Sequence, residues 1–564
     1  MDALQSNYLI PRPLTLDCFE EIIGYLIDDP GSLYSCLLVN RLWCRIAIPL
    51  LWSHPFEHYA FGESAADIIQ IYISCLPEDE RQFLIDEGLK LPPPSSPLFD
   101  YPKYLQSFES ARFTGAVMSW LSSGVKSWLS LVEEQGSDIH VDTYIIQTVI
   151  GSLLFSRSKG LKDLEIVYFD EDDDSLISDI ISFDNAGGAL SRLEKFVFDY
   201  SSLEEQGDKH LGIISNLFNF MSQCTRNIQD IRIDIDIPFD QDMVISEVAQ
   251  SFARLIKAQK ALKVLNILKF WRPEIVSFIF ETLTSQTNTL TYLEVHELYQ
   301  GQFQSLLDIL PSLTNLETLQ FHGFSGNDGE NMKVNISATG PINIKHLHYK
   351  ANKFQVDIFN LMDPLLQMAG GNLRTLSLEC VTSEIVLLIG RNCPNLTHLS
   401  LSLTTQEIPE SVSELLSSMT NLQHFSLYIY SSDPPFATTE NLLQFSLSIP
   451  PSLLYFGFYL AITPYILEYF LRNCRAKLQV LTIHKYDNNL LPVITNYASE
   501  YGCLKKLLID LDAYHDESSL SEIIEEAKKV IPIVDNIIET SYPFSGPYPE
   551  TYVDLWNRNI TVPS

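Results

Sequence analysis

The stretch that decides the fold reads NLRTLSLE over residues 372–379 and returns as NLTHLSLS over residues 395–402. Both copies carry the same phrase: an apolar residue, two others, a second apolar residue, one other, and a third apolar residue. In the first copy these positions are Leu373, Leu376 and Leu378. The last two are two residues apart and share one face of a strand, while the first precedes them where the chain turns inward. The pattern predicts one short strand per copy.

The phrase recurs about thirteen times between residues 161 and 509. Besides the two copies above, its apolar positions are Leu161-Leu164-Ile166, Leu193-Phe196-Phe198, Ile228-Ile231-Ile233, Leu262-Leu265-Ile267, Leu290-Leu293-Val295, Leu316-Leu319-Phe321, Ile344-Leu347-Tyr349, Leu422-Phe425-Leu427, Leu453-Phe456-Phe458, Leu478-Leu481-Ile483 and Leu504-Leu507-Ile509. Successive middle positions lie 23 to 35 residues apart. Such a period is typical of solenoids, in which each unit buries its apolar face against its neighbours.

The segments between the predicted strands are amphipathic and can return as helices. Examples are Ser413–Leu422 and Glu384–Leu396, the second of which Pro394 stops before the next strand. The pattern resembles leucine-rich repeats, which run about 20 to 29 residues each. We therefore expect an α/β fold over residues 161–512, a curved solenoid with parallel strands inside and helices outside. The apolar positions of the phrase are expected to form its core.

Residues 10–55 predict a separate small helical module. Asp17 and Glu20 resemble a capping box at the start of a first helix. The motif Asp28-Asp29-Pro30-Gly31 ends that helix, and Ser32 is a candidate cap for a second helix, which Pro49 interrupts. The second helix is apolar on two sides, with Leu33 and Cys36 on one face and Val39 and Trp43 on another. So small a unit cannot bury both sides internally, and a partner surface is expected.

This module resembles an F-box. The residues at matching spacing are Leu14, Asp17, Ile22-Ile23, Tyr25-Leu26, Val39-Asn40-Arg41-Leu42-Trp43 and Trp52. Thr15 stands where the family usually has proline, and Asn40 where it usually has cysteine. The resemblance to F-box proteins with leucine-rich repeats covers residues 14–52 by motif and about 160–510 by repeat type.

The resemblance implies a substrate receptor of a Skp–cullin–F-box ubiquitin ligase. The F-box would dock on a Skp-type adaptor, linked to a cullin and a RING protein, and the solenoid would hold a target protein for ubiquitination. The residues implied at the adaptor are Leu14, Phe19, Ile22, Ile23, Leu26, Val39, Trp43, Leu51 and Trp52. Some of them must also pack internally. The alternative is a non-catalytic leucine-rich-repeat scaffold whose N-terminal helices only cap the solenoid.

The target would contact the inner surface of the sheet, where residues between the buried strand positions point. Candidates are the polar residues His346, His348, Arg374, Ser377, His398, Ser400, His424 and Ser426. Each of them is as readily explained by simple solvation.

Composition excludes several function classes. The formal net charge of −34 disfavours nucleic acid and acidic membranes as partners. We find no phosphate-binding loop and no zinc-protease or serine-hydrolase motif, and we expect the twelve histidines to lack a fixed acidic partner. The nine cysteines show no zinc-ligand spacing. We therefore expect a non-catalytic, acidic protein that needs no cofactor or metal and resides in the cytoplasm or the nucleus.

The sequence leaves the role of three segments undecided. Residues 56–160 form either a helical linker or irregular first repeats, with helices expected near Ala65–Leu76 and Phe113–Glu133. Residues 513–564 are expected to cap the solenoid, beginning with a helix over Ser518–Ile533. The acidic run from Asp170 to Asp174 could bind a cation or a basic peptide, but a solvated loop explains it more simply.

Overall fold

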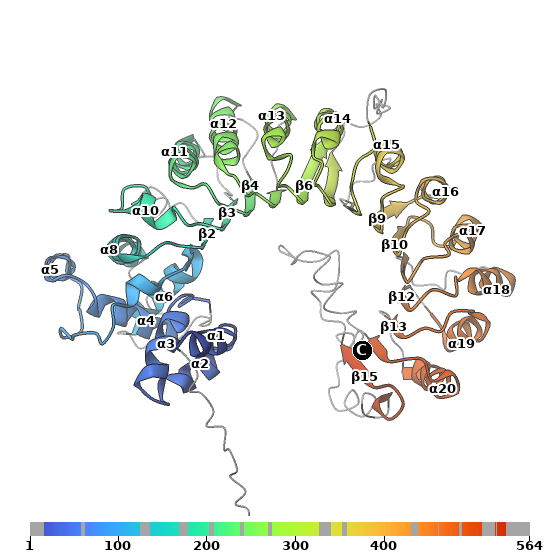
Figure 1. The fold of residues 1–564 in the computed structure, drawn as a ribbon, viewed down its shortest axis with the longest axis horizontal. Coiled ribbons are helices and arrows are strands. Elements are labelled where there is room, and N and C mark those ends of the chain that lie inside the picture. The colour runs from blue at the N-terminus through green and yellow to red at the C-terminus, as the bar shows by residue number, and fades with distance from the viewer. Residues whose placement is uncertain are drawn as a thin grey trace, which may run out of the picture. The chain divides into compact units, whose positions relative to one another are not determined.

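The computed structural model describes residues 16–57, 63–123, 136–168, 179–201, 208–236, 242–268, 273–325, 340–351, 358–429, 438–460, 462–483, 488–509, 525 and 527–536. The chain divides into two compact units, Met1–Trp271 and Arg272–Ser564. Each unit is an α/β repeat array in which parallel strands lie side by side and helices cover one side (Figure 1).

The first unit begins with the N-terminal helices and continues into the repeats. Its strands are β1 (Ser107–Glu109), β2 (Asp163–Tyr168), β3 (Lys195–Ser201), β4 (Asp230–Asp236) and β5 (Val264–Leu268). Its helices are α1 (Leu16–Gly24), α2 (Pro30–Leu37), α3 (Arg41–Leu51), α4 (Glu63–Ser74), α5 (Glu78–Asp86), α6 (Ser110–Ser123), α8 (Gly136–Arg157), α10 (Ala186–Leu190), α11 (Asp208–Cys224) and α12 (Asp242–Ala258).

The described residues of the second unit form a succession of repeats. Its strands are β6 (Tyr292–Tyr299), β7 (Thr318–Ser325), β8 (His346–Lys350), β9 (Thr375–Val381), β10 (His398–Leu403), β11 (His424–Ile429), β12 (Tyr455–Tyr459), β13 (Val480–Ile483), β14 (Lys506–Ile509) and β15 (Ile533–Asn536). Its helices are α13 (Pro273–Leu283), α14 (Gln300–Ile309), α15 (Phe359–Ala369), α16 (Ser383–Asn392), α17 (Glu410–Ser418), α18 (Thr439–Ser448), α19 (Pro464–Asn473) and α20 (Leu491–Tyr501).

The repeat phrase is confirmed as the strand-forming element. Each strand from β2 to β14 contains the second and third apolar positions of one copy. Those side chains are at most 3% exposed. Neighbouring strands pair in parallel with equivalent positions opposite each other, as with Leu376, Leu399 and Phe425. This register stacks the apolar residues of successive repeats into one core per unit, which supplies the burial that a lone short strand lacks.

Asparagine at the start of several copies has a specific role in the second unit. The side-chain amides of Asn315, Asn343, Asn372 and Asn395 each donate a hydrogen bond to a backbone carbonyl of the preceding repeat. The bond from Asn372 Nδ2 to the Ile342 carbonyl, for example, is 2.8 Å long. Turn carbonyls without a strand partner are thereby satisfied, which ties each repeat to the previous one.

The N-terminal module differs in detail from the predicted helices. Residues 32–48 are not one helix, because the chain breaks between α2 and α3. Asp29, and not Ser32, caps α2, since its carboxylate accepts a 3.0 Å hydrogen bond from the Ser32 amide. Asn40 caps α3 by accepting from the amides of Leu42 and Trp43.

Two further local predictions are wrong. The first helix begins at Leu16, so Asp17 lies inside its first turn and is not a cap. Pro49 lies within α3, which continues to Leu51. The end of α3 tolerates the missing N–H because Ile46, Ala47 and Ile48 are buried and hold the helix in place.

The repeat array extends beyond its predicted limits at both ends. β1 pairs in parallel with β2. Residues 56–160, which were predicted to form either a helical linker or irregular first repeats, therefore contribute a strand that begins at Ser107. At the other end β15 pairs with β14, past the predicted boundary at residue 512. The helix predicted to reach Ile533 is wrong at its end, because β15 begins there. The acidic run from Asp170 to Asp174 and the tail after residue 536 lie outside the described residues.

The helices predicted near residues 65–76 and 384–396 are confirmed as α4 and α16, and that near residues 113–133 is confirmed as α6 as far as Ser123. In the part of the chain that the structure describes, no helix combines the length and the apolarity that crossing a membrane requires.

Candidate functional site

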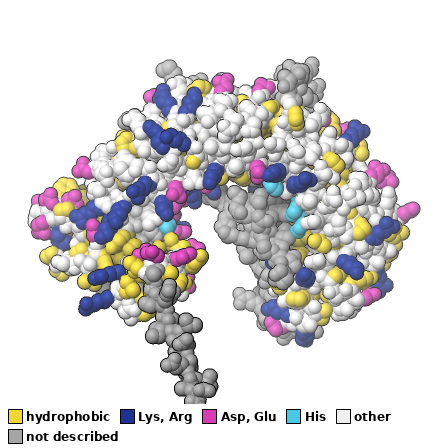
Figure 2. Space-filling model, in the orientation of Figure 1, with side chains coloured by type: hydrophobic (Ala, Val, Ile, Leu, Met, Phe, Trp, Pro, Cys, Tyr) yellow, Lys and Arg dark blue, Asp and Glu magenta, His cyan; other side chains and the backbone are white. Residues whose placement is uncertain are grey.

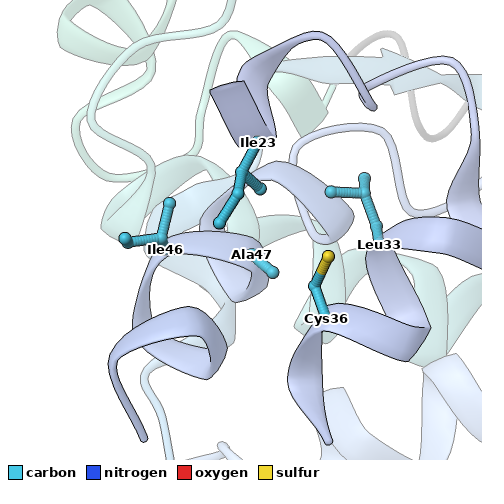
Figure 3. Packing of buried hydrophobic residues seen from close by; sticks show 5 residues of the cluster. All are labelled: Ile23, Leu33, Cys36, Ile46 and Ala47. Carbon is cyan, nitrogen blue, oxygen red and sulfur yellow. The ribbon is translucent and has the colours of Figure 1, made fainter. Parts of the chain in front are cut away.

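The helical module α1–α3 has a small core of its own. Five buried side chains converge from the three helices, as Figure 3 shows: Ile23, Leu33, Cys36, Ile46 and Ala47. Ile23 comes from α1 and fills the space between α2 and α3. The partly buried side chains of Phe19, Leu26, Trp43 and Leu51 pack against this core. The module is therefore held together by only a few apolar contacts.

The structure sorts eight of the nine residues predicted at the adaptor into exposed, half-buried and buried groups. Ile22 and Val39 are exposed, while Phe19, Leu26, Trp43 and Leu51 are half-buried against the module core. Leu14 lies outside the described residues.

Two of the nine residues are buried, in line with the expectation that some of them also pack internally. Ile23 is fully buried, because α1 turns this side of the helix toward α2 and α3. Trp52 is buried, because its ring packs 4.3 Å from that of Tyr101 and 5.4 Å from that of Tyr72. Neither side chain presents a surface to a partner.

Several exposed apolar residues were missed by the sequence reasoning. Leu38 is 77% exposed and lies beside Val39 in the turn between α2 and α3. Tyr25 is 81% exposed, just after α1. Apolar side chains gather over this module in the space-filling view, at the lower left of Figure 2. The signal that could have located Leu38 is the cap at Asn40, which forces a break in the helix.

The module also continues into the repeat array of its own unit. The Ser53 carbonyl accepts hydrogen bonds of 2.9 and 3.0 Å from the amides of Gln106 and Ser107, where β1 begins. Together with the packing of Trp52, these bonds fix α3 against the end of the strands. The module therefore closes the first strand's edge and still keeps Leu38, Val39 and Ile22 exposed.

The second candidate surface is a row of polar side chains along the inner face of the second unit. The parallel register places His346, Thr375, His398, His424 and Tyr455 opposite one another on five consecutive strands. A second row, two residues further along, is smaller: His348, Ser377, Ser400, Ser426 and Gly457. Histidine side chains are visible along this inner side in Figure 2.

Seven of the eight predicted target-binding residues lie on these rows, and Arg374 comes just before β9, but many are less accessible than predicted. Arg374 is exposed, and His346 and His398 are half-buried. The residues whose predicted exposure is wrong are His348, Ser377, Ser400, His424 and Ser426, all of them buried. Strands only about 4.8 Å apart make equivalent side chains cover one another, and the small serines lie between rows of larger neighbours.

A third group on the same unit was not predicted at all. Glu294 and His296 lie on one face of β6, and His322 on β7 is directly opposite His296. Glu294 Oε1 lies 2.8 Å from His296 Nε2 and 3.1 Å from His322 Nε2. The two imidazole rings are stacked with centroids 4.0 Å apart. The prediction that the histidines lack a fixed acidic partner is therefore wrong here.

Two neighbours complete this group. The Tyr292 hydroxyl donates a 2.9 Å hydrogen bond to Glu294 Oε2. Gln320, opposite Glu294, has its amide nitrogen 2.5 Å from His322 Nε2. In the sequence, this group corresponds to the motif E-x-H in one repeat and Q-x-H in the next. The two motifs form a cluster only when the two repeats are aligned in register. We call Glu294, His296 and His322 the carboxylate–histidine cluster.

Burial and hydrogen bonding together set the charge of these side chains. Burial lowers the pKa of His322 to about 4 and that of His348 to about 3. Burial alone would raise the pKa of Glu294, but hydrogen bonds from His296 and His322 outweigh it and hold that pKa below its usual range. At neutral pH Glu294 is therefore an anion, and His322 and His348 are neutral.

Comparison of the sequence with protein-family models gave no match, and comparison with curated proteins gave none either. Solved structures that resemble the chain include the yeast Rad7–Elc1 complex, at 12% identity and a TM-score of 0.31, covering 70% of this chain and 92% of that chain. A protein from Bacteroides fragilis matches at 16% identity and a TM-score of 0.30, covering 48% of this chain and 79% of the other.

The complex of TLR13 with the RNA ssRNA13 matches at 14% identity and a TM-score of 0.28, covering 64% of this chain and 53% of that chain. Likenesses at this level carry no function over to this chain. Its function has to be argued from its own residues.

Proposed function

We propose that this chain is the substrate-recognition subunit of a Skp–cullin–F-box ubiquitin ligase. In this proposal α1–α3 dock on a Skp-type adaptor, and the polar inner face of the repeat array binds a target protein. The receptor makes and breaks no bonds itself. It raises the effective concentration of the target near the ubiquitin-carrying enzyme.

The observation that carries the proposal is the exposed apolar surface of the helical module. Leu38 and Val39 stand in the turn between α2 and α3 at 77% and 56% exposure, and Ile22 on α1 is 50% exposed. Exposed apolar residues concentrated on one small module are typical of a partner surface. Val39 belongs to the Val39-Asn40-Arg41-Leu42-Trp43 phrase that resembles the F-box, so motif and exposure coincide.

A second function is favoured by a different observation. The bonds from Gln106 and Ser107 to the Ser53 carbonyl, with the packing of Trp52, are what a simple end cap requires. In that case the chain is a leucine-rich-repeat scaffold that delivers nothing to a modifying enzyme. The scaffold does not account for the exposure of Leu38 and Val39, which a cap would bury.

The test is co-purification of the full chain with a Skp-type adaptor, followed by titration calorimetry. We expect a one-to-one complex, and we expect Ile22→Asp with Val39→Asp to weaken it at least tenfold without changing the circular dichroism spectrum. The matched control is Leu387→Asp with Leu447→Asp, which places the same charges on exposed leucines of α16 and α18 and should leave binding intact.

Two results contradict the proposal. The first is a wild-type chain that forms no complex with the adaptor. The second is a folded Ile22→Asp, Val39→Asp variant that binds as tightly as the wild type. Either result leaves the scaffold as the remaining function.

A further inference from the structure

The carboxylate–histidine cluster on β6 and β7 brings three potential metal ligands to one point. The ligand atoms of Glu294, His296 and His322 all lie within 4.8 Å of one another. Both imidazoles direct Nε2 at the same carboxylate oxygen, Glu294 Oε1. Two strands in parallel register fix this geometry, since His296 and His322 are paired across the ladder.

Hydrogen bonds within the cluster cannot satisfy every polar atom. A neutral imidazole carries one N–H, so His322 Nε2 either donates or accepts. If it donates to Glu294 Oε1, the Gln320 amide nitrogen 2.5 Å away is a second donor facing it. If it accepts from Gln320, it faces the carboxylate oxygen with a lone pair at 3.1 Å.

Turning the Gln320 amide does not remove the conflict. The atom now assigned as Gln320 Nε2 lies 3.3 Å from Glu294 Oε1. After the turn, the amide oxygen would face that carboxylate oxygen instead. Each of these three arrangements leaves one contact between like groups in a buried place, where such contacts are costly. With the amide turned, a cation among the ligand atoms removes the conflict, because His322 Nε2, the amide oxygen and the carboxylate oxygen can then all direct lone pairs at it.

The kind of donor identifies the kind of cation. Two imidazole nitrogens and one carboxylate oxygen are the ligands of open zinc sites, in which water takes the fourth position. The ligand side chains are 9%, 13% and 23% exposed for Glu294, His322 and His296 respectively, so one side of the cluster remains accessible. The Tyr292 hydroxyl holds Glu294 Oε2 and so orients the carboxylate, as outer groups do around metal ligands.

The charge of the whole chain acts in the same direction. A formal net charge of −34 attracts cations to the protein surface. The carboxylate of Glu294 is buried, and a bound divalent ion would compensate its charge at short range. Lys350, opposite His322 on β8, is a cationic neighbour that opposes binding in part.

We propose that Glu294, His296 and His322 form a binding site for one Zn²⁺ ion per chain. The ion ties β6 to β7 on the inner face of the second unit and leaves one coordination position for water. This site is independent of the adaptor-docking role proposed above, and it is not required for that role.

A second histidine pair provides a matched control. His398 and His424 are stacked 4.1 Å apart on β10 and β11, much as His296 and His322 are on β6 and β7. Among the described residues, the metal-ligand clusters of three or more groups do not include this pair. It therefore reproduces the stacking and the parallel register but lacks a carboxylate ligand.

The test uses the full chain without a histidine tag, freed of metal by a chelator and then titrated with Zn²⁺ by calorimetry. The visible absorption of bound Co²⁺ gives a second readout that reports nitrogen and oxygen ligation. We expect one high-affinity ion per chain. We expect Glu294→Gln with His322→Gln to weaken binding at least a hundredfold and to abolish the Co²⁺ band, while His398→Gln with His424→Gln retains both.

Three results would overturn the proposal: no stoichiometric binding by the wild type, unchanged binding by the cluster variant, or equal loss in the control variant. Circular dichroism establishes that each variant is folded. If the double variant fails to fold, Glu294→Gln alone decides, because glutamine keeps the size of the side chain and removes the anionic ligand. Adaptor binding, measured in parallel, is expected to be the same with and without Zn²⁺.

Discussion

The imidazole rings of His398 and His424 lie face to face, with centroids 4.1 Å apart and planes within 6° of parallel. The two residues are directly opposite each other because β10 and β11 pair in parallel with equal register. Tyr455 on β12 extends the stack, its ring centroid 5.6 Å from that of His424. Burial lowers the pKa of His398 to about 4, with His346 as the second cause, and burial lowers the pKa of His424 to about 3, with His398 as the second cause.

This stack makes the stability of the second unit depend on pH. A histidine in the unfolded chain has a pKa of about 6.5. As the pH falls below this value, the unfolded chain binds protons at these side chains while the folded chain keeps them neutral. The stabilisation is therefore present above pH 6.5 and is lost as the pH falls toward the folded pKa values. Between pH 7.5 and 5.5 we expect a loss of about 1 kcal/mol per histidine.

Thermal unfolding followed by circular dichroism over this pH range checks the prediction. The variant His398→Gln with His424→Gln should show a smaller loss of stability on acidification than the wild type. Carboxylates titrate mostly at lower pH and contribute equally to both proteins. Parallel pH profiles for the two proteins would show that this pair is not responsible.

Replacement of Ile23 tests the core of the helical module. Ile23→Ala removes a fully buried side chain that α2 and α3 surround, and such truncations cost about 2 to 5 kcal/mol. A module with so few core residues should then open locally. Hydrogen exchange of amides in residues 16–57 should accelerate strongly. Ile22→Ala, at the exposed neighbouring position, is the control and should change exchange little.

Removal of the Asn40 cap should weaken the start of α3. The Asn40 side chain accepts bonds of 2.9 and 3.1 Å from the amides of Leu42 and Trp43. Asn40→Ala should cost about 0.5 to 2 kcal/mol, whereas Asn40→Ser, which can also cap, should cost much less. Hydrogen exchange at Leu42 and Trp43 provides the measurement. Equal protection in both variants would mean that the cap does not stabilise α3.

Two glycines should respond to alanine in opposite directions. A Cβ on Gly457 would lie 2.9 Å from Ser426 Oγ and 2.9 Å from a ring carbon of Tyr459, so Gly457→Ala should cost about 1 to 3 kcal/mol. A Cβ on Gly212, within α11, meets nothing within 4 Å. There alanine should stabilise the helix by about 0.5 to 1 kcal/mol. Denaturant titration measures the free energy of unfolding, which should fall in Gly457→Ala and rise in Gly212→Ala. A change of the same sign in both variants would contradict this packing.

Most of the repeat architecture could be predicted from local sequence. The phrase in NLRTLSLE alternates apolar and polar residues with period two, and thirteen strands from β2 to β14 follow it. The short strands β1 and β15 were missed because they lack the full phrase and are recognised only by their pairing with β2 and β14. In the helical module, the break at Asn40 was missed. The Asn40 side chain can either cap a new helix or lie within a continuous one, and composition alone does not decide between these two conformations.

The sequence by itself determined which residues face the core, because period-two alternation within a strand is a local property of the backbone. It also determined that the repeats stack, since a single short strand cannot bury its apolar face alone. Only the tertiary structure decided which polar residues meet. His322 lies 28 residues after Glu294 in the chain, yet parallel register brings its Nε2 within 3.1 Å of the Glu294 carboxylate. The same register covers His424 and Ser426 and leaves Arg374 exposed, because access depends on the side chains of neighbouring strands and not on the residue's own strand.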